Sequence, residues 1–272
     1  MNCLTRILLL LLLPFFTVNT SAKTVDLIFV LDASGSVGQN NWETQNEFVS
    51  ELIRRLPGED YNIGLISFST NAIVRHSLSD HQSYESISSA LTNMPYSGGS
   101  TNHRDAINTA LDMHESFNSG NDLFMAMFTD GTSYPVSSGS VCQRNFSAGI
   151  ATRNRFLNSG AEPLIYAVGS AINTATIDCI TTNPDAEIVH VSDYQEHRLL
   201  ATSGLFYAAI DPENYSGSPI DYDGFEGACI SSGYNYIEGE CFISSASTVP
   251  VPTAAWLFGS ALVGVVGLKR KK

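Results

Sequence analysis

An apolar run that ends in small, oxygen-bearing residues constrains the fold of this chain more than any other feature. Residues Val25–Leu31 are mostly apolar and β-prone, and Asp32, Ser34 and Ser36 follow them directly. Such a run predicts a buried strand of a parallel sheet, and open α/β sheets bind ligands at the carboxyl ends of such strands. Because Gly35 permits a tight turn, one carboxylate and two hydroxyls can point at a common position. This oxygen set suits a hard divalent cation such as Mg²⁺.

Strand and helix patterns alternate along the first three quarters of the chain. Strands are predicted at 61–68, 72–76, 123–128, 163–168 and 186–191, and helices at 39–56, 83–91, 103–117, 143–157, 174–180 and 192–209. Such alternation favours a doubly wound, mostly parallel sheet flanked by helices. We therefore expect one α/β domain over residues 23–211.

Two more segments complete a resemblance to a known family. Ser97–Asn102 reads Ser-Gly-Gly-Ser-Thr-Asn and contains Thr101, and Phe124–Gly131 is a second apolar run that ends in Thr-Asp-Gly, with its acid at Asp130. Together with the Asp-x-Ser-x-Ser sequence that begins at Asp32, these segments resemble the metal-ion-dependent adhesion site (MIDAS) of von Willebrand factor type A (VWA) domains. Three motifs in the family's order are far more specific than any one of them alone.

The resemblance implies both a fold and a site. The fold is a Rossmann-like sheet in which the strand at 72–76 is an antiparallel edge strand. The implied metal-site residues are Asp32, Ser34, Ser36, Thr101 and Asp130. The three hydroxyls would bind Mg²⁺ directly, with Mn²⁺ or Ca²⁺ as alternatives, and the two carboxylates would act mainly through waters and hydrogen bonds to the inner ligands. One coordination position would stay open for an Asp or Glu side chain of a protein partner.

The motif residues also have ordinary structural alternatives. Ser36 could cap the helix predicted to follow it, and Thr101 could cap the helix that begins at His103. Asp130, followed by Gly131, could form a simple turn at the end of a strand.

The resemblance implies an exported cell-surface or matrix protein that binds a protein ligand, in adhesion or in assembly of an extracellular matrix or biofilm. The alternatives are a structural envelope protein whose metal only stabilises the fold, and a metal-dependent hydrolase. We expect no enzyme, because the chain lacks a Gly-x-Ser-x-Gly elbow, a phosphate-binding Gly-x-x-x-x-Gly-Lys loop and a His-x-x-x-His pair. We expect no nucleic-acid partner, because 27 acidic and 14 basic residues give a net charge of −13, which repels phosphates.

The first 22 residues predict a secretory signal peptide. Arg6 precedes an apolar core, and small residues precede Lys23, where the mature chain would begin. Loss of Cys3 with the signal would leave four cysteines in an oxidising compartment, where disulfides are expected. Four cysteines allow three pairings. We favour the pairs Cys142–Cys179 and Cys229–Cys241.

The C-terminal part of the sequence differs in composition from the α/β segment. Residues 212–248 predict a small disulfide-closed appendage with a hairpin and a Ser-rich linker. Residues 251–268 carry no charge and are long enough to span a membrane, and the basic tail at 269–272 would stay cytoplasmic. The segment 249–272 resembles the PEP-CTERM sorting signal of Gram-negative bacteria, which an exosortase processes, except that Val251 stands where that signal has Glu. We expect export to the envelope or beyond, with this tail as a single-pass anchor or a cleaved signal.

Overall fold

The structure of the protein is a computed structural model that describes residues 24–56, 61–169, 172, 174–182, 187–195, 199, 202–210, 235–237 and 240–242. The chain divides into two compact units, Met1–Gly217 and Ser218–Lys272, and each unit is described by itself. The signal peptide predicted at 1–22, the segment at 249–272 and Cys229 of the second expected disulfide lie outside the described residues.

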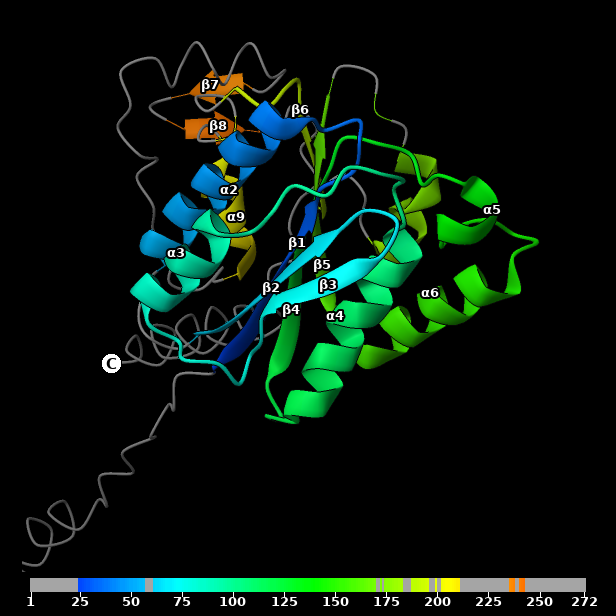
Figure 1. Ribbon diagram of the computed structural model, residues 1–272, viewed down its shortest axis with the longest axis horizontal. Helices are drawn as coiled ribbons and strands as arrows, with labels where there is room; N and C mark the ends of the chain where they lie inside the picture. The colour runs from blue at the N-terminus through cyan, green and yellow to red at the C-terminus, as the bar shows by residue number, and fades with distance from the viewer. Residues whose placement is uncertain are drawn as a thin grey trace, which may run out of the picture. The chain divides into compact units, whose positions relative to one another are not determined.

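A six-stranded sheet forms the centre of the first unit (Figure 1). Its strands are β1 (Val25–Asp32), β2 (Tyr61–Phe68), β3 (Ala72–His76), β4 (Asp122–Thr129), β5 (Glu162–Val168) and β6 (Ile188–Val191). They lie in the order β3-β2-β1-β4-β5-β6. β3 is antiparallel to β2 and the other neighbouring strands are parallel, so the predicted doubly wound sheet and its antiparallel edge strand are confirmed.

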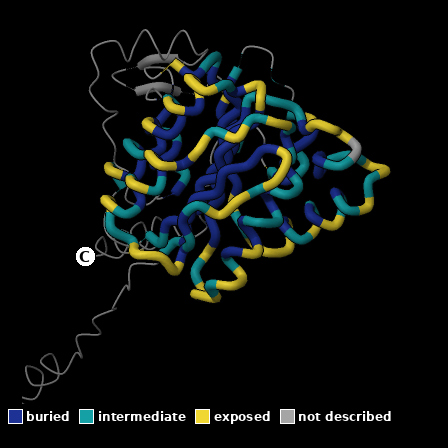
Figure 2. Tube along the Cα trace, in the orientation of Figure 1, coloured by how far each residue is buried: buried dark blue, intermediate teal, exposed yellow. Residues whose placement is uncertain are grey.

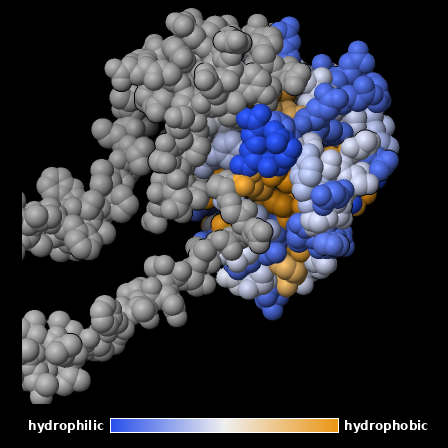
Figure 3. All heavy atoms as spheres, turned by 90° about the vertical axis from the view of Figure 1, so that its left-hand side faces the viewer, coloured by the Kyte–Doolittle hydropathy of each residue, from blue (hydrophilic) through white to orange (hydrophobic). Residues whose placement is uncertain are grey.

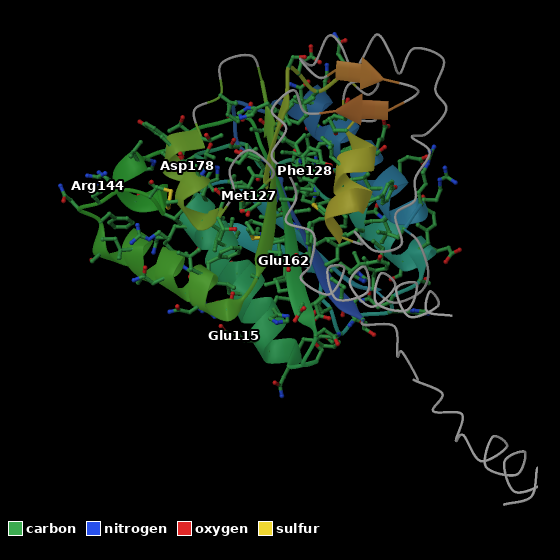
Figure 4. The ribbon with its side chains drawn as sticks, turned by 180° about the vertical axis from the view of Figure 1, so that it is seen from behind. Glu115, Met127, Phe128, Arg144, Glu162 and Asp178 are labelled. Carbon is green, nitrogen blue, oxygen red and sulfur yellow. A yellow bond between two sulfur atoms is a disulfide. The ribbon has the colours of Figure 1, made fainter. Side chains whose placement is uncertain are left out.

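Burial of both sheet faces explains the unbroken apolar runs of the central strands. Successive side chains of a strand point to opposite faces. In β1, Phe29 belongs to one apolar core cluster and Val30 to the other. In β4, Phe128 and Met127 divide in the same way, and Figure 4 shows them on opposite sides of the sheet. Figure 2 shows the buried strands at the centre of the unit.

Helices cover both faces of this sheet. One core cluster joins the sheet to α2 (Gln39–Arg54), α3 (Tyr84–Thr92) and α9 (Ser203–Ile210). The other joins it to α4 (His103–Phe117), α6 (Ser147–Ser159) and the 3₁₀ turn η2 (Asp178–Ile180). The 3₁₀ turn η1 (Thr174–Thr176) contacts η2, and the short helix α5 (Val136–Gly139) contacts α4 and α6. In Figure 3, which views the molecule from the side of α2 and α3, hydrophilic and hydrophobic residues both reach the described surface.

Three predicted helices have different limits in the structure. The helix predicted at 143–157 begins only at Ser147, because the chain first makes a turn in which Phe146 N–H donates to Gln143 O (3.2 Å). Gly149, in the first turn of α6, lies so close to Ser140 O that a Cβ at this position would overlap it. The helix predicted at 174–180 is the pair of 3₁₀ turns η1 and η2, and the short α5 was not predicted.

The helix predicted from 192 to 209 is interrupted before α9. Residues Ser192–Gln195 are not helical, and Asp193 Oδ1 accepts a hydrogen bond from Gln195 N–H (3.0 Å). Thr202 donates its hydroxyl to Leu199 O (2.6 Å), and α9 follows it at Ser203. A threonine side chain that bonds to a preceding carbonyl offers the backbone an alternative to a continuous helix.

The second unit contains one described pair of strands. β7 (Asn235–Ile237) and β8 (Glu240–Phe242) pair in the antiparallel sense, with Asn235 opposite Phe242. This pair lies in the segment for which a hairpin is predicted. Over the whole of the described residues, no helix is both long enough and apolar enough to cross a membrane. The span predicted at 251–268 is outside them.

Candidate metal centre

The three sequence motifs meet where the strand order of the sheet reverses. β1 and β4 are neighbours, and the strand order runs outward from them in opposite directions (Figure 1). A reversal of this kind opens a crevice at the carboxyl ends of the strands, where α/β proteins bind ligands. Asp32 ends β1, Thr129 ends β4 directly before Asp130, and Thr101 lies just ahead of α4. The topology therefore gathers all three motifs at one edge of the sheet.

Four of the predicted side chains form a continuous polar cluster. Ser34 Oγ lies 3.1 Å from Ser36 Oγ. Ser36 Oγ donates a 2.8 Å hydrogen bond to Asp130 Oδ1, across 94 residues of sequence. Thr101 Oγ1 and Ser36 Oγ face the same point, because each would lie 3.6 Å from a Cβ built on Gly131. The small size of Gly131 keeps the space between these oxygens open.

Asp32 adjoins this cluster and is fully buried. Its Oδ1 accepts a hydrogen bond from Ser34 N–H (2.9 Å) and its Oδ2 accepts one from the hydroxyl of Thr129 (2.7 Å). Burial raises the pKa of Asp32 to about 7, against the opposing effect of these hydrogen bonds, and the charge of Asp130 adds to the rise. Burial also raises the pKa of Asp130. Within the described chain, no positively charged group contributes to either shift, so both carboxylates lack a cationic partner.

Backbone contacts fix the Thr101 loop against the first motif. Gly35 N–H donates to Gly99 O (2.9 Å), and the hydroxyl of Tyr96 donates to Ser34 O (3.0 Å). These two contacts hold the loop that carries Thr101 against the turn that carries the two serines.

The alternative roles as helix caps are wrong for Ser36 and Thr101. Gly38 precedes α2, and no side chain caps that helix. α4 is capped by Asn102, whose Oδ1 accepts a hydrogen bond from Asp105 N–H (3.1 Å). The hydroxyls of Ser36 and Thr101 therefore have no capping role to explain their positions.

This oxygen set could hold a hard divalent cation. Neutral hydroxyls and carboxylates are donors that Mg²⁺, Mn²⁺ and Ca²⁺ prefer. Among the residues that the structure describes, no three His, Cys, Asp or Glu side chains form a group suited to a metal ion. A cation at this edge of the sheet would therefore depend on the hydroxyl oxygens of Ser34, Ser36 and Thr101 as well as on the two carboxylates.

The cluster is buried on one side and open on the other. Asp32, Ser34 and Thr101 are buried, whereas Asp130 is half-buried and Ser36 is exposed. A hollow of about 400 Å³ lies beside Asp130. Its other lining residues are Asn41, Val168, Gly169, Ile172, Ser192, Asp193 and Tyr194. Among the described residues, the cluster is open to a ligand on the side of Ser36 and Asp130.

Sequence reasoning missed the buried residues that support Asp32. Thr129 stands in the Thr-Asp-Gly sequence, but its contact with Asp32 was not predicted. His103 and Ser133 are also buried, and both lie in the same hydrogen-bonded chain as Thr129. Nothing in the local sequence marks Ser133, because its partners are distant along the chain.

The first unit contains the disulfide Cys142–Cys179, one of the two pairs that we favoured from the sequence. It joins the segment after α5 to η2, with the two Cα atoms 5.5 Å apart. A disulfide closing a loop of this size stabilises a fold mainly by restricting the unfolded chain.

A protein-family model and several known proteins match this chain. Residues 26–202 match the family model of the von Willebrand factor type A domain. Cochlin of Mus musculus is 29% identical over 144 residues, covering 48% of this chain and 26% of cochlin. The collagen alpha-1(VI) chain of Gallus gallus is 24% identical over 207 residues, covering 70% of this chain and 19% of the collagen chain. This chain thus spans only about a fifth to a quarter of the length of these relatives.

Solved structures agree on the fold. Proximal thread matrix protein 1 from the mussel byssus has a TM-score of 0.57 at 17% identity, covering 68% of this chain and 48% of that chain. A second structure of the mussel protein, described as having a zinc-occupied MIDAS motif, has a TM-score of 0.55 at 16% identity. Since the family model covers well over half of the sequence and the sheet has the matching topology, this chain belongs to the von Willebrand factor type A domain family.

Proposed function

We propose that this protein binds a divalent cation at the carboxyl edge of its sheet and uses it to capture an acidic side chain of a protein ligand. Ser34, Ser36 and Thr101 would hold the cation directly, and Asp32 and Asp130 would hold it through water. The observation that carries the proposal is the convergence of these five side chains from three loops. The hydrogen bond between Ser36 and Asp130 spans two of those loops.

Charge explains why the cation would attract a carboxylate. Hydroxyl ligands carry no charge, so a cation held mainly by Ser34, Ser36 and Thr101 keeps most of its own. A bound cation is the largest local charge in such a site and reverses the electrostatics around it. The chain as a whole has a net charge of −13, which repels acidic partners elsewhere on its surface. Acidic ligands would therefore bind only where the cation is.

Mg²⁺ is the cation that we propose, with Mn²⁺ and Ca²⁺ as alternatives. Its preference for oxygen ligands and retained waters matches a site with three hydroxyls and two carboxylates. The zinc-occupied MIDAS motif of the mussel protein supports a divalent cation at the corresponding place in the fold.

We place this function in adhesion or in an extracellular matrix. Among the relatives, one is named as a collagen chain and another as a thread matrix protein. The disulfide Cys142–Cys179 is of a kind that persists in oxidising compartments. On sequence grounds alone, we also propose that residues 1–22 are an export signal. Residues 249–272 would be a sorting or anchoring segment that an exosortase-like enzyme processes. No enzymatic activity is part of the proposal.

Calorimetric titration of the full chain with Mg²⁺ and Mn²⁺ tests the cation site. We expect saturable binding at one site, and loss of that binding in Ser34→Ala, which removes a direct ligand. Ser140→Ala is the matched control, because Ser140 is as deeply buried as Ser34 and its hydroxyl, among the described residues, bonds to Thr176 O and Cys142 N–H, away from the polar cluster. Equal binding by Ser34→Ala and the wild type would refute the assignment.

A further inference from the structure

A chain of buried hydrogen bonds leads from Asp32 away from the cation site. The Thr129 hydroxyl donates to Asp32 Oδ2 at 2.7 Å, and His103 Nε2 lies 3.0 Å from Thr129 Oγ1. On the other side of the imidazole, Nδ1 lies 2.7 Å from Ser133 Oγ. All four residues are almost completely buried. None of His103, Ser133 or Thr129 is among the five proposed metal-site residues.

Counting the protons shows in which direction the hydrogen bonds between Asp32 and Ser133 are donated. A threonine hydroxyl has one proton, and that of Thr129 is used on Asp32, so Thr129 Oγ1 accepts from His103 Nε2–H. His103 is fully buried with a hydroxyl against each ring nitrogen, so its imidazole is taken as the neutral form, which carries a single N–H. Nδ1 is then an acceptor and takes the proton of the Ser133 hydroxyl at 2.7 Å, in preference to Gly139 O, which lies farther from that hydroxyl at 3.1 Å. The donors therefore run from Ser133 through His103 and Thr129 to Asp32.

The imidazole determines where the Thr129 hydroxyl points. Gly131 O lies 3.4 Å from Thr129 Oγ1 and is an alternative acceptor for its proton. With His103 donating to the oxygen, the hydroxyl proton is directed away from the imidazole and toward Asp32. Without that N–H, the hydroxyl could rotate between the two acceptors. Asp32 would then keep only its hydrogen bonds from Ser34 among the described residues.

His103 also connects the loops that carry the metal-site residues. It is the first residue of α4, two positions after Thr101, and it contacts the residue directly before Asp130. The Phe68 ring packs against the imidazole at 5.7 Å between ring centroids, which restricts its rotation. A movement of the Thr101 loop would therefore change the hydrogen bonding of the Asp32 carboxylate.

We propose that His103, held by Ser133, is a positioning residue for the cation site: it orients the Thr129 hydroxyl and thereby the Asp32 carboxylate, and so sets the affinity for the cation without touching it. This inference rests on the proposed cation-binding function.

Two substitutions at His103 test the proposal by calorimetric titration of the full chain with Mg²⁺. His103→Phe keeps a planar ring but removes both nitrogens, and we expect the Mg²⁺ affinity to fall about tenfold, at the lower end of the loss typical of outer-shell partners. His103→Gln keeps an N–H donor and an acceptor oxygen, and we expect it to recover most of the lost affinity. Recovery by an amide would not follow from packing alone.

A pair of serines separates positioning from general stability. Ser133 and Ser140 are both 1% exposed, and each loses one buried hydroxyl on substitution by alanine. We expect both variants to lower the thermal midpoint, and only Ser133→Ala to weaken Mg²⁺ binding. In ¹⁵N NMR of the imidazole, we expect a neutral ring protonated at Nε2 in the wild type, with the Nδ1 resonance shifted in Ser133→Ala. This spectrum tests the positioning role of His103 even if His103→Phe does not fold.

The outcomes distinguish this inference from the proposed function. A wild-type chain that binds no divalent cation overturns both. Binding that Ser34→Ala abolishes but folded His103→Phe leaves unchanged overturns the positioning role alone. An imidazole protonated at Nδ1 in the wild type, or equal Mg²⁺ affinities for Ser133→Ala and Ser140→Ala, overturns it as well.

Discussion

β1 carries one buried aspartate near each end, and the fold gives the two carboxylates different surroundings. Asp26 lies near the amino end of the strand and Asp32 at its carboxyl end, and both are fully buried. Asp26 accepts hydrogen bonds from four side chains: Asn62 Nδ2 (2.8 Å), His114 Nδ1 (3.0 Å), Ser119 Oγ (2.5 Å) and Asn121 Nδ2 (2.9 Å). In the described residues, Asp32 accepts three, from Ser34 N–H, the Ser34 hydroxyl and the Thr129 hydroxyl.

The number of donors separates a structural carboxylate from a candidate functional one. The four donors of Asp26 come from β2, α4 and the loop that leads into β4, so Asp26 ties these elements together at the amino edge of the sheet. Asp32 is equally buried but has fewer donors and a raised pKa, and its neighbours are the hydroxyls of the polar cluster. A buried carboxylate without enough donors is costly unless a cation or a proton neutralises it. The comparison therefore points to the carboxyl edge as the place for a cation.

Removal of Asp26 should have the largest effect on stability. Asp26→Ala leaves four donors facing a space without an acceptor, and we expect it to lower the free energy of unfolding by about 3 kcal/mol or more. Urea unfolding measures this loss. Where the variant remains folded, its Mg²⁺ affinity should equal that of the wild type. Reduced affinity in a folded Asp26→Ala protein would show that the two ends of β1 are not independent.

Asp32→Asn should instead change how the stability of the protein depends on pH. In the cation-free protein the folded-state pKa of Asp32, about 7, lies above its ordinary value of 3.8. The native state therefore holds the proton more tightly, and the stability from this group is complete below pH 3.8 and is lost as the pH rises through about 7. Without divalent cations, we expect the free energy of unfolding of the wild type to fall by on the order of a few kcal/mol over this pH range. We expect no such fall in Asp32→Asn. Denaturant unfolding at a series of pH values in EDTA compares the two slopes.

Added Mg²⁺ should stabilise the protein by binding at the carboxyl end of β1, where Asp32 lies, and not at the amino end, where Asp26 lies. A ligand that binds only the folded state at about 100 times its dissociation constant adds about 2.7 kcal/mol to the free energy of unfolding. We expect this gain in the wild type and in Asp26→Asn, and none in Asp32→Asn or Ser34→Ala. Thermal unfolding with and without Mg²⁺ measures it. A gain in Ser34→Ala equal to that of the wild type would place the cation elsewhere.

The motifs of the carboxyl edge could be predicted from sequence because each is local. An apolar run followed by Asp32 and the two serines marks both a buried strand and its ligand-binding end, the run that ends in Thr-Asp-Gly marks a second such strand, and the Gly-Gly-x-Thr segment marks a loop. Parallel pairing of β1 and β4 then brings the two carboxyl ends together, beside the loop between α3 and α4 that carries Thr101. This explains why strand positions and the predicted cluster needed no knowledge of long-range contacts.

The supporting contacts could not be predicted because their partners are distant in sequence. Thr129 lies 97 residues from Asp32, and Ser119 lies 93 residues from Asp26. From sequence alone, the serines that follow Asp32 mark its end of the apolar run, but nothing local shows that Asp26 at the other end accepts hydrogen bonds from three distant segments. The errors at helix ends have another cause: short-range turns interrupt the predicted helices, as where Thr202 Oγ1 donates to Leu199 O and Phe146 N–H donates to Gln143 O, and hydrophobic periodicity does not reveal them.

Two glycines extend the comparison to the loops at each edge, with the smallest expected effects. Gly99 lies in the Thr101 loop and Gly120 in the loop that carries Ser119 to the Asp26 network, and both have positive φ, at 93° and 78°. An alanine at either position adopts an unfavourable backbone conformation that costs about 1–2 kcal/mol. A Cβ on Gly120 would contact nothing within 4 Å, whereas one on Gly99 would lie 2.8 Å from Thr70 Oγ1.

Gly120→Ala should therefore lose only the strain energy, whereas Gly99→Ala should lose more and also displace the Thr101 loop. We expect weaker Mg²⁺ binding in Gly99→Ala and unchanged binding in Gly120→Ala, measured by calorimetry beside urea unfolding of both. Because Gly99 O also accepts the hydrogen bond from Gly35 N–H, a shift of this loop reaches the Asp-x-Ser-x-Ser turn. If both variants bind Mg²⁺ as the wild type does, then the Thr101 loop does not help to set the cation affinity, and Thr101 loses its place among the proposed ligands.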